Sequence, residues 1–347
     1  MTSTLHFRSP TGEMVEAEVR TSDAESPRGE FLTTRQVWLL DDDTELCLHG
    51  VAKGLRHSPG YDRLDNEILA GRRLYEVAES DGGGYPLEVA RLYGDEATSA
   101  APYALFLPDR GEPLSKVAAN LVPDEKESCQ TSLLTALCWL AAAGIAHRSL
   151  SPDTVLWDGQ RVQITDFSLS TVFGVPREAI AGLRGWVPRE QRPDYVRGQV
   201  SECDDIWAAG RLIFFINVGE VPANRDQLAD SGLGELLGGV FGPPEERPTA
   251  EKLLGRAGQR NPVPRAVDES AWLKDERKRF WEARKRKYPG AAVPPEADED
   301  AGRSRSTEPH GTSFPAAPSG TIPADASTQP DGPAREPARR RHFRRRG

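Results

Sequence analysis

Apolar residues in the first 110 positions fall into short runs that turn-forming residues interrupt. The runs 37–40 and 46–48 flank the turn 41–44 (Asp-Asp-Asp-Thr), a pattern that predicts a β-hairpin. Apolar positions in 64–79 recur at helical spacing, which predicts a helix. Two further short strands are predicted over 87–92 and 103–107. The first part of the chain is therefore expected to be rich in β-strands.

Helical patterns dominate from about residue 126. The segment 132–143 is apolar on nearly all sides, as expected of a central, buried helix. Two short strands, 155–157 and 162–164, surround the turn Asp158-Gly159. Further helices are predicted over 206–217 and 248–254. The pattern predicts an α+β fold in which a small β-rich part precedes a larger helical part.

The C-terminal residues differ sharply in composition from the rest. The segment 269–288 is charged and favours a helix with a narrow apolar stripe, which needs a packing partner. After it, 290–347 is rich in Pro, Ala, Ser and Gly, so we expect this tail to be disordered. It ends in the basic run 339–346, which suggests contact with an acidic protein, nucleic acid or anionic lipid; the alternative is a solvated tail.

Composition narrows the class of protein. The formal charge of −9 over 347 residues gives the chain as a whole no nucleic-acid-binding signature. The four cysteines form no C-x-x-C pair, so zinc and redox sites have no support. The longest apolar stretch, 133–146, is too short to span a bilayer, and the N-terminus lacks a secretory signal. We expect a cytoplasmic protein, and the Ala, Arg, Gly and Pro content suggests a GC-rich bacterial genome.

Two neighbouring segments carry the most specific signal. The first runs from His147 to Trp157 and begins His-Arg-Ser-Leu-Ser-Pro-Asp-Thr; the second is Asp166-Phe167-Ser168. Together they resemble the catalytic loop, H-R-D-L-x-x-x-N, and the metal-binding loop, D-F-G, of protein kinases. The resemblance implies a bilobal protein kinase-like fold over 15–258.

Other landmarks of that family follow in the expected order. Glu190 stands in the place of the A-P-E glutamate, Asp205 is the acid that anchors the central helix, and Arg247 precedes the final helix. The resemblance implies a buried Glu190–Arg247 ion pair, and places the αC-helix glutamate at Glu67. The N-lobe is expected over about 15–110 and the C-lobe over 111–258, with a hinge at 106–111. A linker with the charged helix, 259–289, follows them.

The catalytic loop departs from the pattern of an active kinase. Ser149 replaces the aspartate that accepts the proton of the substrate hydroxyl, and a serine hydroxyl is far too weak a base. Thr154 replaces the asparagine that holds the second magnesium ion, and Ser151 replaces a lysine near the transferred phosphate. Transfer of phosphate depends on positioning and neutralising charge, so each loss weakens it.

The nucleotide-binding positions are altered as well. His49 stands where the resemblance places the ATP-clamping lysine, with Lys53 as a displaced substitute. Ser168 replaces the glycine of D-F-G, and Gly29 is the only glycine between Val19 and Gln36, so no glycine-rich loop is present there.

The resemblance therefore implies a pseudokinase that acts through protein partners as a binding or regulatory scaffold in signalling. Asp166 and Glu67 remain as a remnant of a nucleotide site, with Asp166 able to hold one metal ion, although neither ATP nor magnesium is required. The open alternatives are a weak kinase, for which Asp153 is the nearest spare carboxylate, another ATP-dependent transferase, and a nucleotide sensor without turnover. Six positions are interpreted as structural: His147, Arg148, Phe167, Glu190, Asp205 and Arg247.

Overall fold

The computed structural model describes residues 2–52, 59–81, 84–180, 185–193, 195–220 and 232–263. The predicted charged helix at 269–288, the tail at 290–347 and Lys53 lie outside these residues. Within the described residues, no helix is both long enough and apolar enough to cross a membrane.

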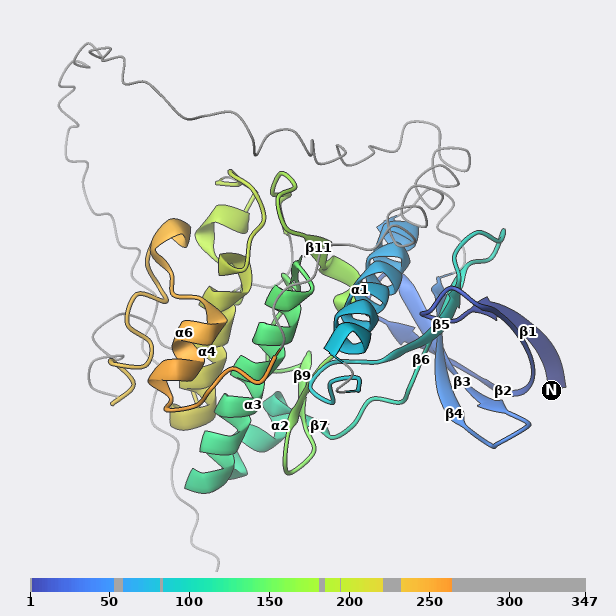
Figure 1. The fold of residues 1–347 in the computed structure, drawn as a ribbon, viewed down its shortest axis with the longest axis horizontal. Helices are drawn as coiled ribbons and strands as arrows, with labels where there is room; N and C mark the ends of the chain where they lie inside the picture. The colour runs from blue at the N-terminus through green and yellow to red at the C-terminus, as the bar shows by residue number, and fades with distance from the viewer. Residues whose placement is uncertain are drawn as a thin grey trace, which may run out of the picture. The chain divides into compact units, whose positions relative to one another are not determined.

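The N-terminal part forms a closed antiparallel barrel with the strand order β1-β2-β3-β4-β6-β5 (Figure 1). Its strands are β1 (Thr2–Arg8), β2 (Met14–Arg28), β3 (Leu32–Leu39), β4 (Glu45–Val51), β5 (Leu92–Glu96) and β6 (Tyr103–Phe106). The predicted hairpin around 41–44 is confirmed as β3 and β4, and the strand predicted over 103–107 is confirmed as β6. The barrel closes where Arg8 of β1 faces Asp95 of β5.

The strand predicted over 87–92 is wrong. β5 begins only at Leu92, and the residues before it form a turn. Val89 is buried there and forms an isolated parallel bridge with Ile164 of the second half of the chain, while Leu87 is exposed. β1 and the long β2 carry no strong apolar pattern and were not predicted.

One helix, α1 (Pro59–Asp81), packs against the barrel and confirms the predicted helix at 64–79. Its buried side chains include Leu64, Ile68 and Leu74. Gly71 permits a close approach, since a β-carbon at this position would lie 2.5 Å from the β-carbon of Leu92. The helix is thereby held directly against β5.

The second part of the chain is mainly helical. Its helices are α2 (Leu114–Val117), α3 (Pro123–Ala142), α4 (Cys203–Val218) and α6 (Ala250–Arg256), with the 3₁₀ helices η1 (Ala118–Asn120), η2 (Phe167–Leu169), η3 (Arg189–Gln191) and η4 (Pro244–Glu246). Short strands connect them: β7 (Glu112–Pro113), β8 (Ile145–Ala146), β9 (Val155–Trp157), β10 (Val162–Ile164) and β11 (Thr171–Val172). The predicted helices within α3, α4 and α6 and the strands β9 and β10 are confirmed.

Two groups of buried side chains hold this arrangement together. A small one fills the barrel with residues such as Phe7, Val37 and Leu105. A larger one runs without interruption from α1 through α3 to α4 and α6, so α1 shares a core with the helical part. The residues from β8 to η2, which contain part of the candidate site, contact α3 through β8 and β10 and contact α1 through η2.

Candidate functional site

The loop that follows β8 is anchored by one buried carboxylate. Asp205, in the first turn of α4, accepts hydrogen bonds from the backbone N–H groups of His147 (2.6 Å) and Arg148 (2.7 Å). Arg148 has a φ of +65°, a conformation that costs free energy outside glycine and persists where its surroundings impose it. Burial raises the pKa of Asp205 to about 7, although these two N–H groups lower it.

His147 is a neutral, fully buried part of the same loop. Its Nε2 lies 2.9 Å from the carbonyl oxygen of Thr165, which can only accept, so Nε2 carries the hydrogen. Nδ1 is then the acceptor and faces the backbone N–H of Ser149 at 3.3 Å. Burial lowers the pKa of His147, and its ring packs edge-on against Phe167 at 4.9 Å. Both side chains hold the loop in shape.

Ser149, at the position expected for the catalytic aspartate, turns into the loop. The residue is 3% exposed, and its Oγ lies 3.1 Å from Nδ1 of His147 and 3.3 Å from the carbonyl oxygen of Asp166. Both neighbours are acceptors, so either one directs the hydroxyl hydrogen inward. This position therefore offers no base to an incoming alcohol.

The other altered hydroxyls of the loop are also engaged locally. Oγ1 of Thr154 accepts from the backbone N–H of Ser151 and lies within hydrogen-bonding distance of the carbonyl oxygen of Ser149, each at 3.0 Å. Asp153 is exposed, and its carboxylate accepts a hydrogen bond from Ser115 of α2 at 2.6 Å. These contacts account for the loop's shape without any ligand.

Asp166 has few side chains near it that could bind a metal ion together with it. Its carboxylate accepts a 3.4 Å hydrogen bond from the backbone N–H of Ser168 and caps η2. Magnesium requires near-octahedral oxygen ligation, and the Thr154 hydroxyl is already used within the loop. Among the described residues, no group of three or more His, Cys, Asp or Glu side chains is arranged to hold a metal ion. These protein side chains therefore do not by themselves form a ligand set for a magnesium ion, and Asp166 could serve as one ligand only if other oxygens completed the set.

The structure brings His49 of β4 and Glu67 of α1 together. Nδ1 of His49 lies 2.9 Å from the Glu67 carboxylate, and the two residues are 4% and 1% exposed. The imidazole also stacks on Phe106 of β6, with ring centroids 4.7 Å apart. Burial alone would raise the pKa of Glu67, but the charges of His49 and Arg28 lower it, so Glu67 is ionised at neutral pH.

Arg28, which the sequence analysis did not identify, supplies a cation to Glu67. It is the last residue of β2, and its Nε lies 3.3 Å from the Glu67 carboxylate. Its Nη1 lies 3.8 Å from Asp109, in the segment predicted to be the hinge. Burial lowers the pKa of Arg28, but the carboxylates of Glu67, Asp166 and Asp109 raise it above its ordinary value. The cation therefore lies where four separate segments of the chain meet.

The predicted hinge, 106–111, has few free backbone N–H groups that could donate hydrogen bonds to the base of a nucleotide. The N–H of Leu107 donates to the carbonyl oxygen of Arg91 at 3.0 Å, and that of Arg110 donates to the side chain of Gln163 at 2.7 Å. Pro108 between them has no N–H. Specific binding of a base depends on a few well-placed polar groups of this kind.

Several buried ion pairs stabilise the surroundings of the site. The predicted pair between Glu190 and Arg247 is confirmed, with a separation of 2.5 Å. Two further pairs were not predicted: Arg177–Asp204, at 2.7 Å, and Arg72–Asp95, in which both carboxylate oxygens accept from the guanidinium.

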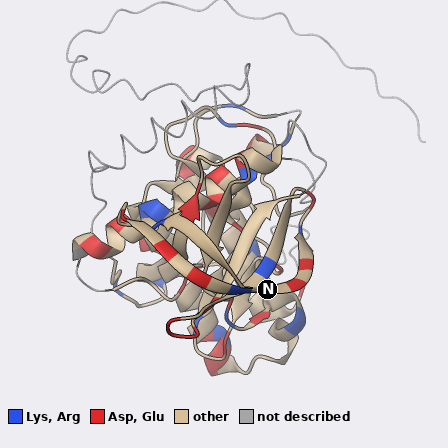
Figure 2. Ribbon diagram, turned by 90° about the vertical axis from the view of Figure 1, so that its right-hand side faces the viewer, with Lys and Arg blue, Asp and Glu red and all other residues tan. Residues whose placement is uncertain are grey.

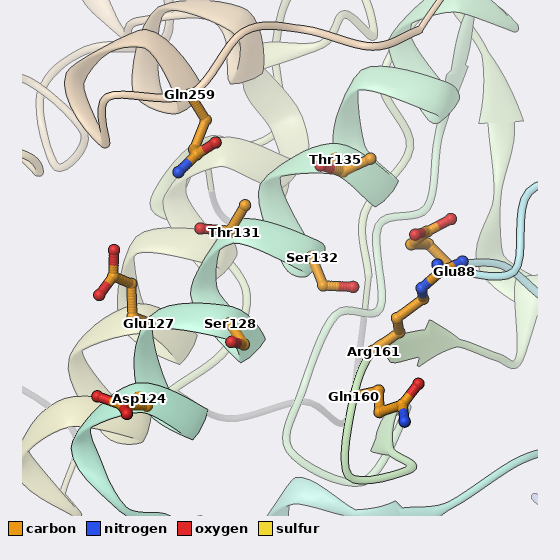
Figure 3. Close-up of a pocket in the computed structure, with 10 residues that line it drawn as sticks. All are labelled: Glu88, Asp124, Glu127, Ser128, Thr131, Ser132, Thr135, Gln160, Arg161 and Gln259. Atoms are coloured by element: carbon orange, nitrogen blue, oxygen red, sulfur yellow. The ribbon is translucent and has the colours of Figure 1, made fainter.

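A shallow hollow of 420 Å³ lies away from these residues (Figure 3). Polar side chains of α3 line it, together with Gln160 and Arg161 from the turn between β9 and β10. It contains none of the predicted site residues, and its Ser132 already accepts a hydrogen bond from the backbone N–H of Val162.

Comparison with known proteins relates the chain to serine/threonine protein kinases. It is 24% identical over 268 residues to the serine/threonine-protein kinase pkn3 of Myxococcus xanthus, an alignment that covers 70% of this chain and 48% of that protein. It is 27% identical over 255 residues to the liver/testis isoform of the phosphorylase b kinase gamma catalytic chain of Bos taurus, covering 65% and 60%. It is 29% identical over 171 residues to CBL-interacting protein kinase 4 of Oryza sativa subsp. japonica, covering 47% and 37%. No family model matches the chain.

Proposed function

The chain belongs to the protein kinase-like superfamily, and we propose that it is a catalytically impaired member that serves as a binding or regulatory scaffold in signalling. In this proposal the barrel with α1 is the small N-lobe of a bilobal kinase-like fold. The helical part from α2 to α6 is the large C-lobe. The chain spans from 37% to 60% of the length of the three relatives described above, so their activities are not transferred to it.

The observation that carries the proposal is the orientation of Ser149. An active kinase aligns a carboxylate with the hydroxyl that attacks ATP, and loss of a general base costs about 10²–10⁴ in rate. Here the residue in that position is 3% exposed and its hydroxyl faces His147. A hydroxyl that is too weak a base and is also engaged within the loop is not available to activate an acceptor alcohol.

The residues that retain the family pattern support shape rather than chemistry. Asp205 holds the loop backbone, Glu190 pairs with Arg247, and His147 packs against Phe167. The positions that carry chemistry in an active kinase are occupied here by Ser149, Thr154 and His49. A chain that keeps the stabilising contacts but not these catalytic residues keeps the shape of the kinase-like surface. We propose that a protein partner recognises that surface.

The proposal is tested by incubating the purified chain with magnesium and γ-labelled ATP, alone and with a generic protein substrate. We expect no transfer above the level of the Asp166→Ala variant. Transfer at an ordinary kinase rate of about 1–100 s⁻¹ that Asp166→Ala abolishes would contradict the proposal. A rise in melting temperature with Mg·ATP but no transfer would instead support the nucleotide sensor.

A further inference from the structure

We propose that Arg28 acts as a built-in cation that fastens the β2–β3 hairpin over the polar cluster of His49, Glu67, Asp109 and Asp166, called the cleft below, and holds α1 in place without a bound nucleotide. This inference rests on the proposed function, because an active kinase must leave the same space open to its nucleotide. It assigns a role to a residue that lies outside all of the recognised kinase motifs in this chain.

The position of Arg28 in the chain suits such a role. It ends β2, and the turn that leads into β3 follows immediately, with Gly29 at a φ of +65°. Its side chain is 18% exposed and extends from this hairpin to Glu67 on α1 and to Asp109 beyond β6. Each contact ties the hairpin to a segment that is distant in sequence.

The negative charges around Arg28 stabilise its side chain in this position, in contact with Glu67 and Asp109. The carboxylates of Glu67, Asp109 and Asp166 all act on it, and Glu67 is 1% exposed. Leaving a buried carboxylate without its counter-charge is strongly unfavourable. An incoming phosphate would have to separate Arg28 from these partners, and it would bring negative charge toward the same carboxylates.

The same network fixes α1. Glu67 is bound by His49 as well as by Arg28, and the neighbouring Asn66 donates a 2.9 Å hydrogen bond to the carbonyl oxygen of Ser168. The helix is thus attached on one side to β2 and β4 and on the other to η2. No bound ligand is needed to complete these attachments.

Cys47 provides a probe of the cleft. It lies on β4 two residues before His49, so both side chains leave the strand on the same face. Burial raises the pKa of the Cys47 thiol to about 11; the charge of Asp109 raises it further, while that of Arg28 lowers it. Removing Arg28 therefore slows alkylation through its effect on charge. Opening the cleft accelerates alkylation through access, so the sign of the change separates the two effects.

The test compares Arg28→Met with Arg35→Met in the full-length chain by iodoacetamide labelling, with peptide mass spectrometry to separate Cys47 from the other cysteines. Arg35 is the matched control, because it lies on the neighbouring β3 and forms a 2.7 Å ion pair with Glu25, away from the cleft. We expect Cys47 to react about tenfold faster in Arg28→Met than in the control, the change that about 1.4 kcal/mol of lost closing free energy produces.

Equal labelling rates in the two variants would overturn the inference. If Arg28→Met fails to fold, judged by circular dichroism, Arg28→Lys carries the test against Arg35→Lys. Lysine keeps the charge but cannot reach two carboxylates as a guanidinium fork does, so labelling should still rise, and an unchanged rate would again refute the role. The labelling uses no nucleotide. Phosphate transfer by the wild-type chain would therefore refute the proposed function alone, and unchanged Cys47 labelling would refute only the role of Arg28.

Discussion

Glu67→Gln removes one negative charge from the centre of the cleft while keeping the size of the side chain. Glu67 is 1% exposed and has two partners, the imidazole of His49 at 2.9 Å and the guanidinium cation of Arg28 at 3.3 Å. A glutamine can still accept a hydrogen bond from one of them, but it carries no charge to offset that of Arg28. The variant therefore leaves positive charge enclosed in the protein.

The magnitude of the effect follows from this geometry. Removing one partner of a buried ion pair typically costs about 3–5 kcal/mol. We expect about 3 kcal/mol here, at the lower end of that range, because Arg28 keeps Asp109 at 3.8 Å. For a folded region of this size the loss corresponds to a fall of about 6–12 °C in melting temperature.

The effect also depends on pH in a defined direction. The folded-state pKa of Glu67 lies below its unfolded value, so its charge stabilises the fold above the unfolded pKa of about 4.3. That contribution is lost as the pH falls through the folded pKa. The difference between wild type and Glu67→Gln should therefore be full at pH 7 and should shrink below about pH 4.

Urea unfolding followed by circular dichroism measures this difference, with Glu79→Gln as the control. Glu79 lies on the same helix but is exposed, so its variant should stay within about 0.5 kcal/mol of wild type. A double-mutant cycle with Arg28→Met should give a coupling free energy of at least about 1 kcal/mol. Equal stability of the two glutamine variants, or simple additivity in the cycle, would refute the electrostatic account of the cleft.

Three further predictions concern other buried groups. Burial raises the pKa of Asp205 to about 7 and that of Asp95 to about 6, above their unfolded values, so both groups stabilise the fold at acidic pH and that contribution is lost as the pH rises through 6 and 7. The lowered pKa of His147 acts in the opposite direction below about pH 6.5, so the urea midpoint should fall most clearly between about pH 6.5 and pH 8, and a midpoint that rises there would contradict the assignment. Arg247→Met leaves the buried Glu190 carboxylate unpaired and should cost about 3–5 kcal/mol in urea unfolding; a loss below about 1 kcal/mol would show that the pair is exposed to solvent. Ser149→Asp buries a carboxylate beside the acceptor Nδ1 of His147, so it should lower the melting temperature and give no phosphate transfer; recovered transfer would contradict the inward orientation of this position.

Local patterns in the sequence were sufficient to predict most of the helical part. The segments 132–143 and 206–217 are apolar enough to specify buried helices, and the turn Asp158-Gly159 specifies the hairpin of β9 and β10. The strand predicted over 87–92 failed because Val89 is buried through a tertiary contact, whereas Leu87 is exposed. Val89 contacts Ile164, a partner that no local pattern reveals.

The sequence predicted which residues occupy most of the candidate site, but not the directions in which their side chains point. The motif placed Ser149, Thr154 and His49 at altered positions, yet the direction of each side chain depends on partners elsewhere in the fold. Arg28 shows the limit most clearly, because it pairs with Glu67 across 39 residues of sequence and belongs to no motif. A cation at the end of a strand is ordinary in a sequence, and its role depends on the carboxylates that the fold brings to it.

Acidic and basic segments are interspersed over the described strands and helices (Figure 2). In the cleft, the charges that are paired directly are those of Arg28 with the carboxylates of Glu67 and Asp109. In our proposal, this pairing is what most directly opposes nucleotide binding.

Isothermal titration calorimetry of the purified wild-type chain with Mg·ATP tests this central claim most directly. The account predicts no saturable heat up to about 1 mM nucleotide, the upper end of ordinary substrate affinities. Saturable binding with one nucleotide per chain and a Kd in the micromolar range would contradict it, because Arg28 would then have to leave its carboxylate partners readily.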